Sequence, residues 1–111
     1  MKDAFFAYDR HELLPEARAI LTQDAGVLKS VLQESPGMVL AVEGHCDERG
    51  SAEYNLALGD LRARAARDFL SELGVAASQL EVISYGKERP QCAADEESCW
   101  QKNRRAHIAA K

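Results

Sequence analysis

The chain has 111 residues, of which 46% are hydrophobic and 29% are charged. This length and composition suit one compact domain, residues 1–111, with a single hydrophobic core. The net charge of −4 argues against nucleic acid as a partner, because nucleic-acid binders gather Lys and Arg on one face. The sequence contains neither an apolar run near the roughly 20 residues of a spanning helix nor a signal peptide, so we expect any targeting segment to lie upstream.

The first half of the chain predicts a strand, a helix and a second strand. The aromatic run at residues 4–8 favours a short strand. Pro15 fits the first turn of a helix, and apolar residues then recur at helical spacing until residues 35–37 end the pattern. The apolar segment 38–42 predicts a central strand. A strand, a helix and a strand in so short a span suggest a parallel pair with a right-handed crossover.

The second half predicts one helix and two strands. The helix is marked by an apolar stripe of Tyr54, Leu58, Leu61, Ala65, Phe69 and Leu73. Gly74 suits the position just after its end. Residues 80–85 and 106–110 predict strands, separated by a long loop at residues 86–102. The predicted fold is an α/β chain of the α+β sandwich kind, β-α-β-α-β-β, with two helices packed on one mixed sheet.

The most informative stretch is residues 44–51, Gly-His-Cys-Asp-Glu-Arg-Gly-Ser, which follows the second strand. It places Asp47 in a turn bounded by glycines. Because ligands gather beyond the carboxyl ends of parallel strands, residues 8–10 are expected to converge on this turn. On the following helix, Asn55, Leu58 and Arg62 share one stripe.

A carboxylate and a guanidinium at one rim suit a ligand that carries both charges, such as the free end of an amino acid. Asp47 can accept hydrogen bonds from an ammonium group, and Arg62 can bind a carboxylate through two parallel bonds. Leu58 can cover an aliphatic stem between them. Two structural alternatives remain open: Asp47 and Arg62 pair only with each other, or Asp47 caps the following helix.

Other chemistries find weaker support. A zinc site would draw on residues 45–47 with His11 or His107, but zinc spacing is absent and neighbouring strand residues point to opposite faces. Cys46 as a nucleophile lacks a motif that fixes a histidine beside it. The acid pair that includes Glu48 has no second carboxylate placed across a cleft, as a glycosidase requires. These three chemistries are therefore not favoured, and we predict no metal and no cofactor.

The chain has three cysteines, an odd number. Cys92 and Cys99 flank an acidic loop and can close a small ring, worth on the order of 2–3 kcal/mol in the loop-entropy model. We predict a disulfide between them, which implies an oxidising compartment. Two reduced thiols in a surface loop are the alternative, and Cys46 is left over.

Several motifs, in order along nearly the whole chain, resemble the OmpA-like C-terminal domain. They are residues 44–50, residues 53–55, Leu58-Gly59, Arg62-Ala63, residues 84–90 and residues 103–106. The Asp-Glu-Arg-Gly and Ser-Tyr-Gly-Lys-Glu segments are most similar to the peptidoglycan-associated lipoprotein branch. The chain departs from that branch at Cys46, where a small residue is common, at Ala66, and in the loop between Cys92 and Cys99.

The resemblance implies a non-catalytic domain that holds peptidoglycan through the diaminopimelate of its stem peptide. It assigns eight positions to the site: Tyr8, Asp9, Arg10, Asp47, Asn55, Leu58, Arg62 and Arg104. In the family, the residues matching Asp47 and Arg62 hold the zwitterionic end of the ligand. Residues 8–10 line the pocket, Leu58 adds apolar contact, and the remaining two positions lie near the site or support it.

The resemblance also implies a location and partners. We expect a periplasmic module, associated with the outer membrane through a lipid anchor upstream of residue 1, that tethers the membrane to the cell wall. The periplasmic propeller protein of the Tol system is a further expected partner. A protein-interaction module of an envelope complex is the alternative function, and an enzyme acting on peptidoglycan is a less favoured one.

Overall fold

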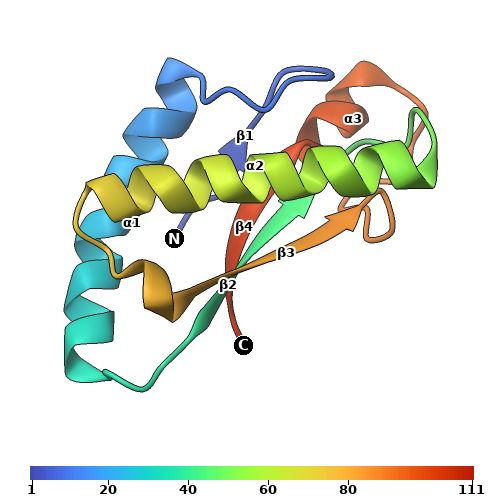
Figure 1. Ribbon diagram of the computed structural model, residues 1–111. Coiled ribbons are helices and arrows are strands. Elements are labelled where there is room, and N and C mark those ends of the chain that lie inside the picture. Colours follow the sequence, from blue (N-terminus) through green and yellow to red (C-terminus); the bar gives the residue numbers. More distant parts are fainter.

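A computed structural model describes all 111 residues and shows two long helices against one twisted sheet (Figure 1). The strands are β1 (Ala4–Phe5), β2 (Leu40–His45), β3 (Leu80–Gly86) and β4 (Arg105–Ala110). The helices are α1 (Pro15–Glu34), α2 (Ala52–Glu72) and α3 (Glu97–Asn103), with a short 3-10 helix η1 (Ala77–Gln79) before β3. The strand order is β1-β4-β2-β3, with β2 parallel to β3 and antiparallel to β4. The predicted mixed sheet and long helices are confirmed.

Two details of the predicted fold are wrong. β1 and β2 are not a hydrogen-bonded pair, because β4 lies between them and runs antiparallel to both. They therefore still run in the same direction, and their carboxyl ends still share one edge of the sheet. The loop at residues 86–102 is also not irregular throughout, since α3 forms at its end. A helix of seven residues is too short to show a hydrophobic period.

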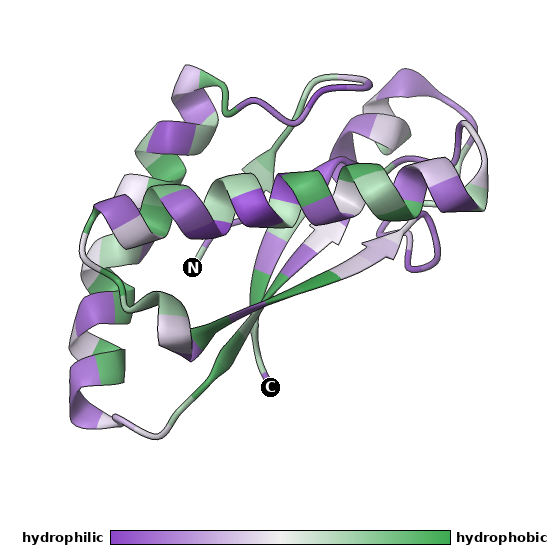
Figure 2. Cartoon of the chain, viewed as in Figure 1, coloured by the Kyte–Doolittle hydropathy of each residue, from purple (hydrophilic) through white to green (hydrophobic).

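α1 and α2 cover the same face of the sheet and share one core with it. Leu21 and Leu28 of α1 and Leu70 of α2 are buried there against Val42 of β2. Residues that alternate with these along the strands face the opposite side. Figure 2 shows polar and apolar turns following each other along α2. Neither long helix carries an apolar stretch that could cross a bilayer.

Two glycines set how closely α2 approaches β2. A side chain on Gly44 would collide with the backbone of Gly59, and one on Gly59 would collide with the side chain of Ser84. The absence of both side chains lets the helix lie directly on the strand. The start of α2 is thereby held against the end of β2, where the motif at residues 44–51 lies.

The buried stripe of α2 lies one position later than the apolar pattern predicted. Tyr54 and Leu61 are exposed. The buried residues are Asn55, Leu58, Gly59, Arg62, Ala63, Ala66 and Leu70. This stripe includes polar residues and a glycine. A pattern based on hydrophobicity alone therefore predicted that the residues next to it are buried. The shift brings the Arg62 side chain into the interior.

Candidate functional site

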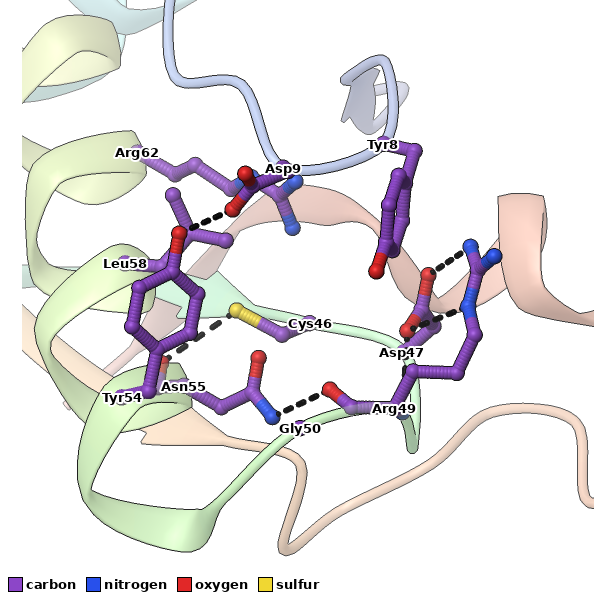
Figure 3. A pocket seen from close by; sticks show the side chains of 10 residues that line it. All are labelled: Tyr8, Asp9, Cys46, Asp47, Arg49, Gly50, Tyr54, Asn55, Leu58 and Arg62. Carbon is purple, nitrogen blue, oxygen red and sulfur yellow. Dashed lines mark hydrogen bonds and ion pairs between the residues drawn. The ribbon is translucent and has the colours of Figure 1, made fainter.

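A small cavity opens where β2 ends and α2 begins (Figure 3). Ten residues line it: Tyr8, Asp9, Cys46, Asp47, Arg49, Gly50, Tyr54, Asn55, Leu58 and Arg62. Six of the eight residues expected at the site are therefore brought together, from the loop after β1, the turn after β2 and the first turns of α2. The other two, Arg10 and Arg104, are not in its lining.

Arg62 is held by backbone carbonyls from distant parts of the chain. Its side chain is only 1% exposed. Nε donates to the Arg10 carbonyl at 2.8 Å, Nη1 to that of His45 at 3.0 Å and Nη2 to that of Ala7 at 3.0 Å. Burial lowers the pKa of the Arg62 guanidinium, yet an arginine stays charged in proteins. The site therefore holds a fixed cation.

Asp47 is also buried, at 4% exposed, but it is held mainly by side chains. Its Oδ1 accepts hydrogen bonds from the amide of Arg49 at 3.0 Å and from Arg49 Nε at 3.2 Å. Its Oδ2 accepts from Arg49 Nη2 at 2.7 Å and from Arg104 Nη1 at 3.3 Å. Burial alone would raise the pKa of Asp47, but these hydrogen bonds outweigh it and hold the pKa below its ordinary value. Asp47 is therefore an anion at neutral pH.

Both structural alternatives for this charge pair are wrong. No ion pair joins Asp47 to Arg62, since the salt bridges of Asp47 go to Arg49 and Arg104. Nor does Asp47 cap α2, because Ser51 is the N-cap and its Oγ accepts from the amide of Tyr54 at 3.1 Å. The two charges thus lie in the wall of one cavity without neutralising each other directly.

Arg49 is the main site residue that the sequence analysis did not identify. Its guanidinium carbon lies 3.7 Å from the ring centre of Tyr8 and 4.1 Å from that of Trp100, a cation held between two aromatic faces. Trp100 is fixed in turn by a hydrogen bond of 2.8 Å from Nε1 to Glu48. The Asp-Glu-Arg order of the motif was the only available signal, because a turn has no period that predicts where its side chains point.

Arg10 and Arg104 support the site from outside the cavity. Arg10 contributes its carbonyl to Arg62. Arg104 lies behind Asp47, where it also donates to the Phe6 carbonyl at 2.9 Å and to Glu97 at 2.7 Å. Of residues 8–10, which were expected to line the pocket, Tyr8 and Asp9 do so and Arg10 does not. A supporting position for Arg104 agrees with this geometry.

Hydrogen bonds also fix the mouth of the cavity. Asn55 Nδ2 donates to the carbonyls of Arg49 at 2.8 Å and Ser51 at 3.1 Å, which pins the turn to the start of α2. The Tyr54 hydroxyl donates to the Asp9 carboxylate on the opposite side (Figure 3). Asp9 has a positive φ of 56°, a left-handed conformation that aspartate tolerates better than most residues.

The OmpA family model matches residues 5–105 of this sequence. This chain belongs to the OmpA family. The peptidoglycan-associated lipoprotein of Mesorhizobium japonicum is 51% identical over 102 residues, which is 92% of this chain and 58% of that protein. This chain therefore spans less than two thirds of that relative. The family resemblance seen in the motifs is confirmed.

Solved structures of other proteins share the fold. The crystal structure of the peptidoglycan-associated lipoprotein from Burkholderia pseudomallei matches with a TM-score of 0.88 and 40% identity, over 100% of this chain and 91% of that one. The C-terminal domain of Helicobacter pylori MotB matches with a TM-score of 0.87 over 97% of this chain and 82% of that one. At 20% identity, the MotB likeness concerns the fold alone.

The cysteines of this OmpA-family chain have separate roles. Cys92 and Cys99 form the predicted disulfide, with Cα atoms 5.3 Å apart. The bond closes the loop that leads into α3, the helix that carries Glu97 and Trp100. Cys46 is buried, and burial raises the pKa of its thiol to about 11. Its Sγ donates to the Asn55 carbonyl at 3.3 Å, so the protonated thiol packs in the cavity floor.

The histidine next to Cys46 in the sequence points away from the cavity. His45 contacts Glu43 through Nε2 at 3.1 Å and stacks on Tyr85. Successive side chains along a strand point to opposite faces, so His45 and Cys46 are expected to point in opposite directions. No group of three or more His, Cys, Asp or Glu side chains is placed to hold a metal ion.

Proposed function

We propose that this chain is a non-catalytic module that binds peptidoglycan without a covalent bond, through the diaminopimelate of the stem peptide. The observation that carries the proposal is one cavity with a buried carboxylate, Asp47, and a buried guanidinium, Arg62, in its wall. The free end of diaminopimelate in the stem peptide carries an ammonium and a carboxylate on one carbon. Asp47 would accept the ammonium, Arg62 would donate to the carboxylate, and Leu58 would cover the first methylenes.

The rigidity of the cavity wall supports this assignment. The Arg62 guanidinium is already oriented by three carbonyls, so binding costs little side-chain entropy on that side. A charged contact shielded from water is also stronger than one at the surface.

We further propose that the module works in the periplasm and tethers the outer membrane to the cell wall. The names of the relatives, peptidoglycan-associated lipoproteins, support both the wall as ligand and a lipid-anchored full-length protein. The Cys92–Cys99 disulfide supports an oxidising compartment. Binding to the Tol propeller protein rests on the family resemblance alone and stays a prediction.

Co-sedimentation with purified diaminopimelate-type peptidoglycan tests the function. We expect the chain to sediment with the wall and to release no muropeptides. Release of muropeptides would support an enzyme instead, and no association would support a protein-interaction module. A wall in which lysine replaces diaminopimelate should bind more weakly, because the side-chain carboxylate that Arg62 would hold is missing.

Asp47→Asn tests the site, because it keeps the shape of the side chain and removes its charge. We expect a loss of about 2 kcal/mol or more of binding free energy, which is about 30-fold in affinity. Asp60→Asn is the matched control, since Asp60 lies on α2 in a surface ion pair with Arg64. Equal binding by the two folded variants would exclude this cavity as the binding site.

A further inference from the structure

The anion that the proposed function assigns to the ligand ammonium already has a cation on it. Three hydrogen bonds from Arg49 and one from Arg104 end on the Asp47 carboxylate. A carboxylate offers about four lone-pair positions. A ligand ammonium therefore reaches Asp47 only when one of these donors leaves.

The structure distinguishes which donor can leave. Arg104 is 5% exposed and is also held by the Phe6 carbonyl and by Glu97. Arg49 is 29% exposed, and every hydrogen bond of its side chain goes to Asp47. Glu97 Oε2 lies 3.9 Å from Arg49 Nη2. The Arg49 head thus makes hydrogen bonds to Asp47 alone, lies between the Tyr8 and Trp100 rings, and has a second carboxylate within reach.

We propose that the Arg49 guanidinium is a built-in competitor for the ligand ammonium, and that binding exchanges one cation for the other on Asp47. On exchange, the Arg49 head moves toward Glu97 while its backbone amide keeps its bond to Asp47. This inference rests on the proposed function and adds a specificity-determining residue to it. The Tyr8 and Trp100 rings hold the competing head in place until a ligand arrives.

The exchange makes the site selective for zwitterions. A ligand that offers only an ammonium gains one contact and loses the Arg49 contact, so the exchange is close to neutral. A ligand that also carries a carboxylate gains the Arg62 contact, and this gain drives the displacement. Opposing the wrong ligand with a competing internal contact is a general route to specificity, and it lowers the apparent affinity for the right ligand as well.

Arg49→Met tests the proposal, since methionine keeps much of the aliphatic length and removes the cation. Arg67→Met is the matched control, because Arg67 is 27% exposed and pairs with Asp68 on the surface of α2. Two probes are titrated by calorimetry: meso-diaminopimelate, and 1,5-diaminopentane, which has the same amines and no carboxylate. We expect Arg49→Met to bind diaminopimelate about two- to fivefold more tightly, the size of one partly exposed ion pair, and to gain measurable binding of the diamine. The control should match the wild type.

Trp100 gives a readout that a purely structural role of Arg49 would not move. It is the only tryptophan of the chain and it lies against the Arg49 head. Diaminopimelate should shift its fluorescence in the wild type, where Arg49 leaves the ring, and much less in Arg49→Met. Arg49→Lys keeps a cation without the planar fork and should give an intermediate affinity.

The outcomes separate this inference from the function on which it rests. If the wild type binds diaminopimelate and Arg49→Met binds it equally or more weakly, Arg49 is no competitor and only the inference fails. If neither protein binds diaminopimelate, the proposed function fails and the inference falls with it. Diamine binding by the wild type would also overturn the proposal, because the competitor would then exclude nothing.

Discussion

The two charged walls of the cavity are built in different ways. Arg62 is held by three backbone carbonyls, those of residues 7 and 10 in the loop after β1 and that of residue 45 at the end of β2. Asp47 is held mainly by the side chains of Arg49 and Arg104, which depend on contacts with α3. Backbone carbonyls move only if the chain segment that carries them moves, whereas side chains can rotate about their own bonds. The cationic wall is thus held by the backbone, and the anionic wall can adapt to a ligand.

The largest expected effect is the loss of stability in Arg62→Met. This change removes the Arg62 donors from three carbonyls, of which only that of Ala7 is shown with another donor, the Arg10 amide at 3.2 Å. The loss of one partner from a buried polar network is costly. We expect the free energy of unfolding to fall by about 3 kcal/mol or more, as measured by urea denaturation.

Arg64→Met, two positions along α2, is the control for Arg62→Met. Arg64 is exposed and pairs only with Asp60 one turn away, so its loss should change stability by no more than about 0.5 kcal/mol. Similar values for the two variants would contradict the idea that the backbone contacts of Arg62 help to stabilise the fold.

The next effect concerns the anionic wall, through the disulfide behind it. Replacing both Cys92 and Cys99 with serine should cost about 2–3 kcal/mol of unfolding free energy, from the greater freedom of the unfolded loop. It should also loosen α3 and change the fluorescence of Trp100. Wild-type protein treated with a reductant should behave in the same way, because Cys46 has no disulfide partner. Unchanged fluorescence would show that α3 does not depend on this bond.

Much of the fold could be predicted from local signals. Pro15 at the start of α1 and Gly74 after α2 are where the pattern placed them, and Gly74 has the positive φ, 99°, that favours glycine. The position of β4 between β1 and β2 could not be predicted. Strand order depends on contacts between segments far apart in the sequence. The alternation of polar and apolar residues within one strand does not show which strand lies beside it.

The site was predictable in its members but not in its connections. The motif and its helix spacing identified Asp47, Asn55 and Arg62, all of which line the cavity. The pattern could not show that carbonyls hold Arg62 or that Arg49 holds Asp47, because both depend on how loops fold back on the helix. The buried face of α2 was also predicted one position too early, because it includes polar residues that a hydrophobic pattern does not count.

The pH dependence of stability tests the pairing of Asp47. A carboxylate whose pKa is lowered on folding stabilises the folded state fully above its unfolded pKa of about 3.9, and this contribution is lost as the pH falls through the folded value. Wild-type protein should therefore keep a constant advantage over Asp47→Asn between about pH 5 and pH 7. The advantage should shrink only in stronger acid. Urea midpoints measured across this range check it, and an advantage that fades above pH 5 would mean that Asp47 is not paired as described.

The smallest expected effect belongs to His45, whose carbonyl helps to hold Arg62 while its ring lies on the far side of the sheet. Burial lowers the pKa of the His45 imidazole, although the hydrogen bond to Glu43 opposes the shift. The unfolded chain therefore takes up a proton first as the pH falls, so this stabilisation is complete above about pH 6.5 and declines as the pH falls toward the folded value. The thermal midpoint of the wild type should drop between pH 7.5 and pH 5.5 by more than that of His45→Gln, with His11→Gln as the control.

Ligand affinity measured over the same pH range further distinguishes the two walls. Arg62 Nη1 bonds the backbone oxygen of His45 and not its ring, so protonation of the ring should lower stability without weakening the binding of diaminopimelate to folded protein. Parallel losses of affinity and stability would show that the end of β2 shifts when the ring is charged. In that case the cationic wall would move with the sheet and would be as adaptable as the anionic one.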